Sequence, residues 1–298
     1  MWPALHKWNI NYISESLPSF KVHQSSFPEI QMLSLVQPFG QLEGPKWRRP
    51  WIEKQVEANH FFKGEEFLYF FSNLEDLPPA LNHDIPDISF LSVGWRPVWE
   101  TNLWMGVPPI RTPIHYDLLH NFYVQLHGNK RFILFPPTDY KYLYLYPRLH
   151  PSTRMSQVNL RNLQNYPDFY KSHPIEVVLS PGDVLYIPPY WFHDVTAVGV
   201  NVSMSVSIHT ESDQSHIRDS MNNIVPVMRK FWKDTQKVDA LAAFMEKLFK
   251  DKEDLLTFLE HFLESRYTPL KYDQSGKGGR SLFVFICDLS SGGACWGP

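Results

Sequence analysis

The 298-residue chain contains only two cysteines, Cys287 and Cys295, so no disulfide framework can organise its fold. It also lacks a signal peptide and any apolar run of membrane-spanning length, so we expect no contact with a membrane. A reducing location, cytoplasmic, nuclear or both, is the expectation that follows. Neither sign of charge dominates, because the formal net charge is −3, and this balance disfavours nucleic acid as a partner.

The sequence is instead rich in aromatic residues, at 15%, and in proline, with 25 residues. Because proline interrupts long helices, this composition predicts short strands and turns. Residues 101–207 alternate β-favouring runs with turn signals, and the signals at Gly128-Asn129 and near Gly199 predict two hairpins. The pattern as a whole predicts a mainly β sandwich or jelly-roll barrel. Before it, residues 51–59 are predicted to be helical.

A helical pattern follows residue 211, where apolar residues recur at helical spacing in three stripes up to residue 263. These stripes have two explanations, packing against the β body or a homodimer interface, and the sequence leaves both open. Residues 269–298 match neither pattern and are expected to form a disordered tail.

His115 and Asp117 lie two positions apart in a predicted strand, so their side chains point to the same face. His193, on a later strand, would complete a set of two histidines and one carboxylate. Such a facial set with open positions is typical of non-haem Fe(II) oxygenases. A single His-x-Asp triplet also arises by chance in surface loops, so the hypothesis depends on the residues around it.

Lys130 shares a strand face with Phe132 and Leu134, which places its ammonium in apolar surroundings. A buried ammonium is costly unless it meets an anion, and the carboxylate of a cosubstrate would be one. The alternative is a lysine at the strand end that reaches water. Thr112 and Tyr69 could add hydroxyl groups to the same pocket.

Several motifs in order carry a family resemblance, densest between about Trp104 and His193. They are Thr112-Pro-Ile-His115-Tyr-Asp117, Asn121-Phe, Gly128-Asn-Lys130-Arg-Phe-Ile-Leu-Phe-Pro-Pro, Pro181-Gly-Asp-Val-Leu-Tyr-Ile-Pro and Tyr190-Trp-Phe-His193. Together they resemble the JmjC (cupin-like) 2-oxoglutarate oxygenases, and among these most of all the asparaginyl hydroxylase type of factor-inhibiting HIF.

The resemblance implies a double-stranded β-helix with flanking helices and a C-terminal helical segment. It implies Fe(II) on His115, Asp117 and His193, and 2-oxoglutarate held through its far carboxylate by Lys130. It further implies that other side chains line the cosubstrate pocket: Thr112, Tyr69, Asn121, and Ser205 in place of a family asparagine, with Asn201 as the other candidate for that position.

The resemblance also divides the chain. Residues 1–100 would be the N-terminal part of the JmjC domain, shortened at its start, and residues 101–210 the catalytic β-helix. Residues 211–268 would be the C-terminal helices and residues 269–298 the tail. One departure concerns specificity: where the asparaginyl hydroxylase holds its substrate amide with an Arg-Gln pair, this chain has Arg154-Met155, and a methionine cannot make that amide hydrogen bond.

The sequence therefore predicts a hydroxylase that acts on a side chain of a protein or peptide, coupled to decarboxylation of 2-oxoglutarate. Two alternatives remain: a catalytically weak member that serves as an interaction scaffold, and a hydroxylase of a modified tRNA base. Histone demethylation is disfavoured, since no histone-reading module accompanies the catalytic body.

Overall fold

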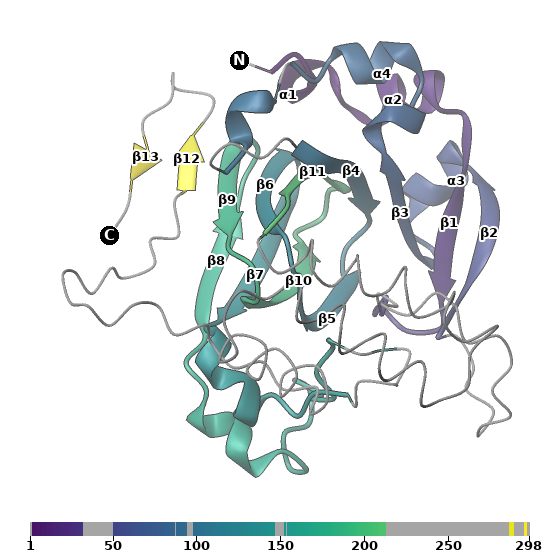
Figure 1. Ribbon diagram of the computed structural model, residues 1–298. Coiled ribbons are helices and arrows are strands. Elements are labelled where there is room, and N and C mark those ends of the chain that lie inside the picture. The colour runs from purple at the N-terminus through teal and green to yellow at the C-terminus, as the bar shows by residue number, and fades with distance from the viewer. Residues whose placement is uncertain are drawn as a thin grey trace, which may run out of the picture.

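The computed structural model describes residues 2–31, 50–86, 88–93, 98–146, 152 and 154–212, and the backbone of residues 286–288 and 295–296. Its strands form two antiparallel sheets (Figure 1). The larger has the order β13-β12-β9-β6-β11-β4-β3-β1-β2 and the smaller the order β5-β10-β7-β8. The mainly β, jelly-roll prediction is thereby confirmed.

The strands of the larger sheet are β1 (Ser19–Ser25), β2 (Trp51–Glu57), β3 (Phe67–Asn73), β4 (Val98–Gly106), β6 (His120–His127), β9 (Asp183–Ile187), β11 (Ser203–Thr210), β12 (Ile286–Asp288) and β13 (Cys295–Trp296). Those of the smaller sheet are β5 (Arg111–Tyr116), β7 (Asn129–Phe135), β8 (Ile175–Leu179) and β10 (Phe192–Val198). Apolar side chains from both sheets meet between them: Tyr123, Phe132, Leu134, Leu179, Leu185, Ile187 and Val195.

Short helices flank the sheets. The described α-helices are α1 (Ala4–Lys7), α2 (Ile10–Ser16), α3 (Ala58–Lys63) and α4 (Pro79–His83), and the 3-10 turns are η1 (Leu74–Asp76), η2 (Ser89–Leu91), η3 (Pro137–Tyr142) and η4 (Pro167–Lys171). Helices α1, α2 and α4 gather at one end of the larger sheet (Figure 1). Buried Asp84 holds this end together, because it accepts hydrogen bonds from Lys7, Trp8 and Tyr12.

Both predicted hairpins are wrong. Strand β6 pairs with β11 and β9, whereas β7 pairs with β10 and β8, so the chain changes sheets at Gly128. It changes sheets again near Gly199, between β10 and β11. Both glycines have positive φ, at 62° and 86°, a conformation that glycine adopts without steric cost. The turn signals were correct, but at each of these two turns the chain passes from one sheet to the other instead of pairing the strands that flank the turn.

The prediction of a helix at residues 51–59 is also wrong for most of these residues. Residues 51–57 form β2, which pairs with β1 along seven residues, and only Ala58 begins a helix. Pairing with β1 therefore overrides the helical pattern of residues 51–57.

The predicted helices and tail, residues 211–298, lie almost entirely outside the described residues, and the domain boundaries and the homodimer stay predictions. Among the described helices, none is long and apolar enough to cross a membrane.

Candidate active site

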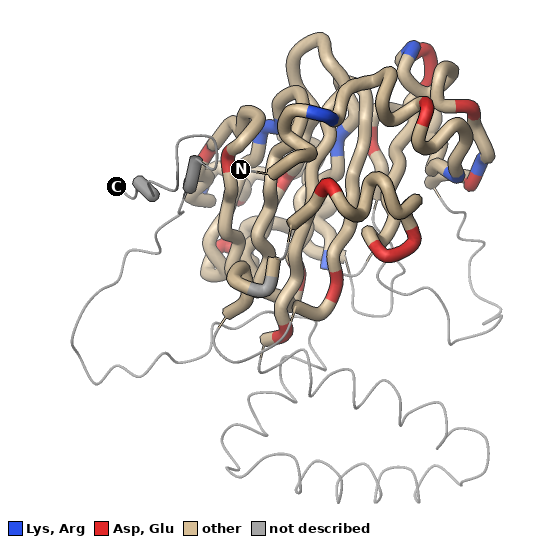
Figure 2. Tube along the Cα trace, turned by 90° about the horizontal axis from the view of Figure 1, so that it is seen from above, with Lys and Arg blue, Asp and Glu red and all other residues tan. Residues whose placement is uncertain are grey.

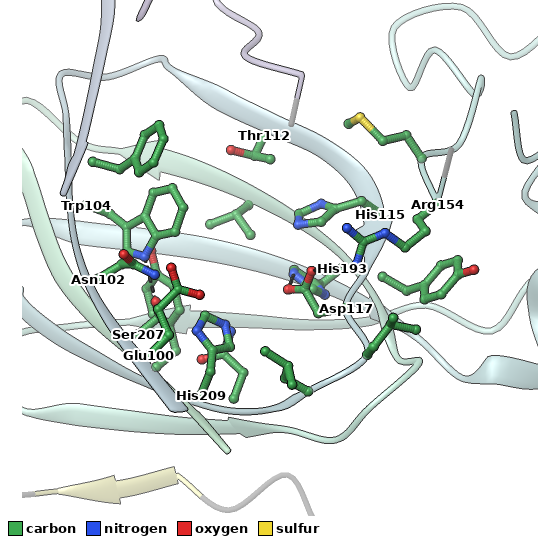
Figure 3. Close-up of a pocket in the computed structure, with 18 of the residues that line it drawn as sticks. Glu100, Asn102, Trp104, Thr112, His115, Asp117, Arg154, His193, Ser207 and His209 are labelled. Carbon is green, nitrogen blue, oxygen red and sulfur yellow. Dashed lines mark hydrogen bonds and ion pairs between the residues drawn. The ribbon is translucent and has the colours of Figure 1, made fainter. Parts of the chain in front are cut away.

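His115 and His193 lie directly opposite each other on the antiparallel pair β5 and β10. Their imidazole rings are 4.1 Å apart between centroids. Asp117 follows the end of β5, and its Oδ2 lies 3.6 Å from Nε2 of His193. One ligand atom from each of the three residues lies within 4.8 Å of the others, as the sequence predicted, so the set could hold a metal ion (Figure 3).

Backbone carbonyls fix the orientation of both imidazoles. Nδ1 of His115 lies 2.8 Å from the carbonyl oxygen of Pro113, and Nδ1 of His193 lies 3.1 Å from that of Trp191. A carbonyl only accepts, so each Nδ1 carries the proton and donates it. Each Nε2 is left with a free lone pair, which is the form that a metal requires.

The electrostatics of the site favour the ligand forms of these residues. Burial lowers the pKa of His115 to about 4, and the neighbouring His193 lowers it in the same direction. Burial opposes ionisation of Asp117, but His115, His193 and Arg154 together outweigh it and hold the pKa of that carboxyl well below its usual value. A neutral imidazole and a carboxylate are therefore present at neutral pH, which fits a divalent cation.

Two turns beside the triad have a left-handed backbone at non-glycine residues, with φ of 69° at Tyr190 and 73° at Arg154. The Tyr190 amide donates to the carbonyl of Asp117 over 2.7 Å. Met155, next to Arg154, forms a β-bridge with His115. Strained residues of this kind persist where the surroundings hold them, and they occur often at functional sites.

A cavity of about 350 Å³ opens beside the triad. Five residues that the sequence predicted as part of the site line it: Thr112, Tyr69, Asn121, Arg154 and Met155. The guanidinium of Arg154 lies 4.0 Å from the carboxylate of Asp117. Asn201, in contrast, is exposed in the connection between β10 and β11 and does not reach the site.

Lys130 is 1% exposed, as its strand face predicted, but its ammonium does not line the cavity. It lies behind the wall, where it donates to the hydroxyl of Tyr123 over 2.5 Å and to that of Ser205 over 2.7 Å. Among the described residues no carboxylate pairs with it, and burial lowers its pKa to about 7. Tyr123, which accepts one of these hydrogen bonds, does line the cavity, and the contact of Lys130 with a cosubstrate stays a prediction.

Hydroxyl groups connect Lys130 to the cavity. Tyr69 shares hydrogen bonds with both Tyr123 and Thr112, and all three residues line the cavity. Burial raises the pKa of both phenols, so they keep their protons and can donate. The Lys130 ammonium also lies 5.0 Å from the ring centroid of Tyr123 and 5.7 Å from that of Tyr69.

The wall of the cavity that faces the triad was not predicted from the sequence. It is built from inward-facing residues of β4 and β11, most of them polar: Glu100, Asn102, Trp104, Ser207 and His209. In register across the sheet, His209 lies between Glu100 and Asn121, and Ser207 lies between Asn102 and Tyr123. Figure 3 shows Glu100, Asn102, Ser207 and His209 together on this side of the pocket. Period-two alternation of polar residues along β4 and β11 is the signal that could have revealed them.

The model of the cupin-like domain family matches residues 1–214 of this chain. The chain belongs to the cupin-like family. It is 30% identical over 246 residues to tRNA wybutosine-synthesizing protein 5 of Mus musculus, covering 74% of this chain and 72% of that protein. For the Danio rerio protein of that name the identity is 27% over 269 residues, with 85% and 79% coverage.

A second group of relatives carries the name HSPB1-associated protein 1. The Homo sapiens protein is 28% identical over 243 residues, which are 72% of this chain and 47% of that protein. A solved structure, that of E. coli ycfD, aligns with a TM-score of 0.38 at 17% identity, over 82% of this chain and 60% of that chain, and this similarity is too low to support an argument.

These comparisons confirm the cupin-like part of the predicted resemblance. The finer likeness, to the factor-inhibiting-HIF type, is not the one that they support, because the relatives bear the two other names.

Proposed function

We propose that this chain is an Fe(II)- and 2-oxoglutarate-dependent hydroxylase whose substrate is a modified base of tRNA. Family membership supports the reaction class, and the names of the wybutosine-synthesizing relatives support the substrate class. One observation carries the cosubstrate part of the proposal: Lys130 is a buried cation without a carboxylate partner among the described residues, and it donates to Tyr123, which lines the cavity that holds two imidazoles and a carboxylate.

Nε2 of His115, Nε2 of His193 and the carboxylate of Asp117 would hold the iron and leave its other positions open. Bound Fe(II), with 2-oxoglutarate and oxygen, supplies the oxidising power that converts a C–H bond to C–OH while 2-oxoglutarate yields succinate and CO₂. The protein's task is to hold the three ligands in their ligating forms, exclude water and place one C–H bond.

The far carboxylate of 2-oxoglutarate would accept hydrogen bonds from the hydroxyls of Thr112, Tyr69 and Tyr123, with the positive charge of Lys130 directly behind them. A buried ammonium without an anion costs the folded protein several kcal/mol. Cosubstrate binding offsets this cost, because a carboxylate that approaches Lys130 stabilises its charged form. The burial of Lys130 without an anion among the described residues favours a cosubstrate-binding enzyme over a scaffold.

Hydroxylation of a protein side chain, our expectation from the sequence, is the second candidate. Met155 stands where the asparaginyl hydroxylase of the sequence resemblance has a glutamine, and a methionine cannot hold an asparagine amide by that hydrogen bond. The names of the relatives also favour the tRNA base. Acidic and basic residues are interspersed over the described chain in the view of Figure 2, so charge alone does not decide between these substrates.

The substrate assignment is tested by incubating unfractionated tRNA with the full chain, Fe(II) and 2-oxoglutarate, and analysing the nucleosides by mass spectrometry. We expect a +16 Da shift in a modified nucleoside, absent with Asp117→Ala. A parallel incubation uses a protein extract digested to peptides. A +16 Da peptide product that depends on 2-oxoglutarate and Asp117, with every nucleoside unchanged, would replace the tRNA base by a protein substrate.

A further inference from the structure

Trp99 occupies an irregular position in strand β4. His209 of β11 is in register with Glu100, but the next residue, Thr210, is in register with Val98, so Trp99 is the extra residue of a β-bulge. A bulge can aim two neighbouring side chains at the same side of a strand. Both Trp99 and Glu100 line the cavity for this reason.

Trp99 leaves a large aromatic surface uncovered at the cavity. Its side chain is 60% exposed, and within the described part of the chain no other ring packs against it. Phe71, 38% exposed, lines the same cavity and stacks on Trp104 with ring centroids 5.2 Å apart. A single exposed tryptophan is common on protein surfaces and does not by itself indicate a ligand site. The polar groups beside Trp99 are what distinguish this one.

Those polar groups are Glu100 and His209, which are cross-strand neighbours and point into the space that Asp117 faces (Figure 3). His209 is 7% exposed, and its Nδ1 is buried without a hydrogen-bond partner among the described residues. Glu100 has no ion-pair partner within the same part of the chain. A buried polar atom without a partner is costly, and a bound ligand that supplies one removes the cost.

We infer that Trp99, Phe71, Glu100 and His209 form a recognition subsite for a flat nitrogen heterocycle of the nucleobase class. The ring stacks on Trp99, while the Glu100 carboxylate accepts from an N–H group on the ring's edge and His209 Nδ1 makes a second hydrogen bond there. This inference rests on the proposed function, and it names the residues that select the substrate at that site.

The charge of Arg154 in the cavity favours a neutral planar ring as the ligand. The other ligand that these residues could bind is a lysine or arginine side chain. A cation would also stack on Trp99 and pair with Glu100. However, Arg154, beside the triad in the same cavity, would repel a cation that reaches toward Asp117. Stacking of bases on aromatic side chains needs no charge and suits every base.

The test is binding of fluorescently labelled, unfractionated tRNA to the full chain, measured by fluorescence anisotropy with Mn²⁺ in place of iron and with 2-oxoglutarate present. Salt is kept at about 0.3 M, so that phosphate contacts contribute less. We expect Trp99→Ala to weaken binding by on the order of tenfold, because it removes one base stack. Trp99→Phe should bind within about threefold of wild type, and Tyr170→Ala, which removes an aromatic ring that is 74% exposed and outside the cavity, should bind as wild type.

Two variants of Glu100 show whether the ligand of the subsite is a neutral ring or a cation. Glu100→Gln and Glu100→Leu remove the same charge, but only glutamine keeps an oxygen that accepts a hydrogen bond. For a neutral ring we expect the leucine variant to bind about fivefold more weakly than the glutamine variant. Thermal unfolding of each variant checks that the fold is intact.

Equal binding by wild type and Trp99→Ala would overturn the inference and leave the proposed function standing. Equal weakening by both Glu100 variants, with an arginine-rich peptide bound in a Trp99-dependent manner, would assign the subsite to a cation and also overturn it. Failure of the wild type to bind tRNA at all would exclude tRNA as the substrate. It would therefore overturn the proposed function together with this inference.

Discussion

At the scale of single residues, Lys130 distinguishes an oxygenase that binds 2-oxoglutarate from a barrel that has metal ligands alone. Its ammonium is buried, and its hydrogen bonds in the described structure go to the neutral hydroxyls of Tyr123 and Ser205. Lys130→Met should raise the apparent KM for 2-oxoglutarate about a hundredfold, as expected for loss of a buried charge pair of ~3 kcal/mol. Metal affinity should change little, since Lys130 is no ligand. An unchanged KM would show that the cosubstrate binds elsewhere.

The same residue predicts a dependence on pH. With a pKa of about 7, Lys130 is charged below pH 7 and becomes neutral as the pH rises. Since only the ammonium attracts a carboxylate, the apparent Kd for 2-oxoglutarate should be constant below pH 7. Above it, the Kd should rise by up to about tenfold per pH unit. Isothermal titration with Mn²⁺-loaded protein measures this, and Lys130→Met should abolish the rise above pH 7.

Lys130 also affects stability, with a sign that follows from its lowered pKa. Between pH 7 and 10.5 the unfolded chain binds a proton at this residue that the folded chain does not. This group therefore makes the free energy of unfolding increase with pH across that window. Chemical unfolding of wild type and Lys130→Met, each without 2-oxoglutarate, should show the difference. A parallel pH dependence in both proteins would contradict the lowered pKa.

At the scale of elements, the crossing at Gly128 allows β6 and β7 to enter different sheets. A Cβ there would meet the backbone carbonyl of Val202 besides requiring a left-handed backbone. Gly128→Ala should therefore lower the free energy of unfolding by roughly 3 kcal/mol. The matched control is Gly199→Ala, because Gly199 also has positive φ but open space around its Cα, so about 1 kcal/mol is expected. If urea unfolding shows that both variants lose the same free energy of unfolding, contact of the added Cβ with Val202 is not the cause of the loss at Gly128.

The elements also indicate what a sequence can and cannot predict. Alternation along one strand placed His115 and Asp117 on a shared face, and the apolar neighbours of Lys130 predicted its burial. Predictions that needed pairing between strands failed: β2 was taken as a helix, and two crossings between sheets were taken as hairpins. Glu100 and His209 were missed for the same reason. Their proximity depends on the register of β4 with β11, about a hundred residues apart, which no local pattern encodes.

At the scale of the whole molecule, two facing sheets place a metal-ligand triad, a buried cation and a wall of hydrogen-bonding groups around one cavity. His115 and His193 lie on β5 and β10 of the smaller sheet, with Asp117 directly after β5, and the opposite wall comes from β4 and β11 of the larger sheet. Under the proposed function, the jelly roll would separate two tasks, since one sheet would hold the iron and the other would present the groups that face the substrate. The match to the cupin-like family extends over residues 1–214, which include both.

If this fold binds iron and 2-oxoglutarate for oxidation, it should release CO₂ from 2-oxoglutarate that is labelled at its first carbon. The purified protein should release CO₂ when Fe(II) is added, even without substrate, and a chelator should stop the release. Asp117→Ala should reduce it to background while circular dichroism shows an unchanged fold. Metal-dependent release that is equal in wild type and Asp117→Ala, or no release from a folded, Fe(II)-loaded wild type, would contradict the account.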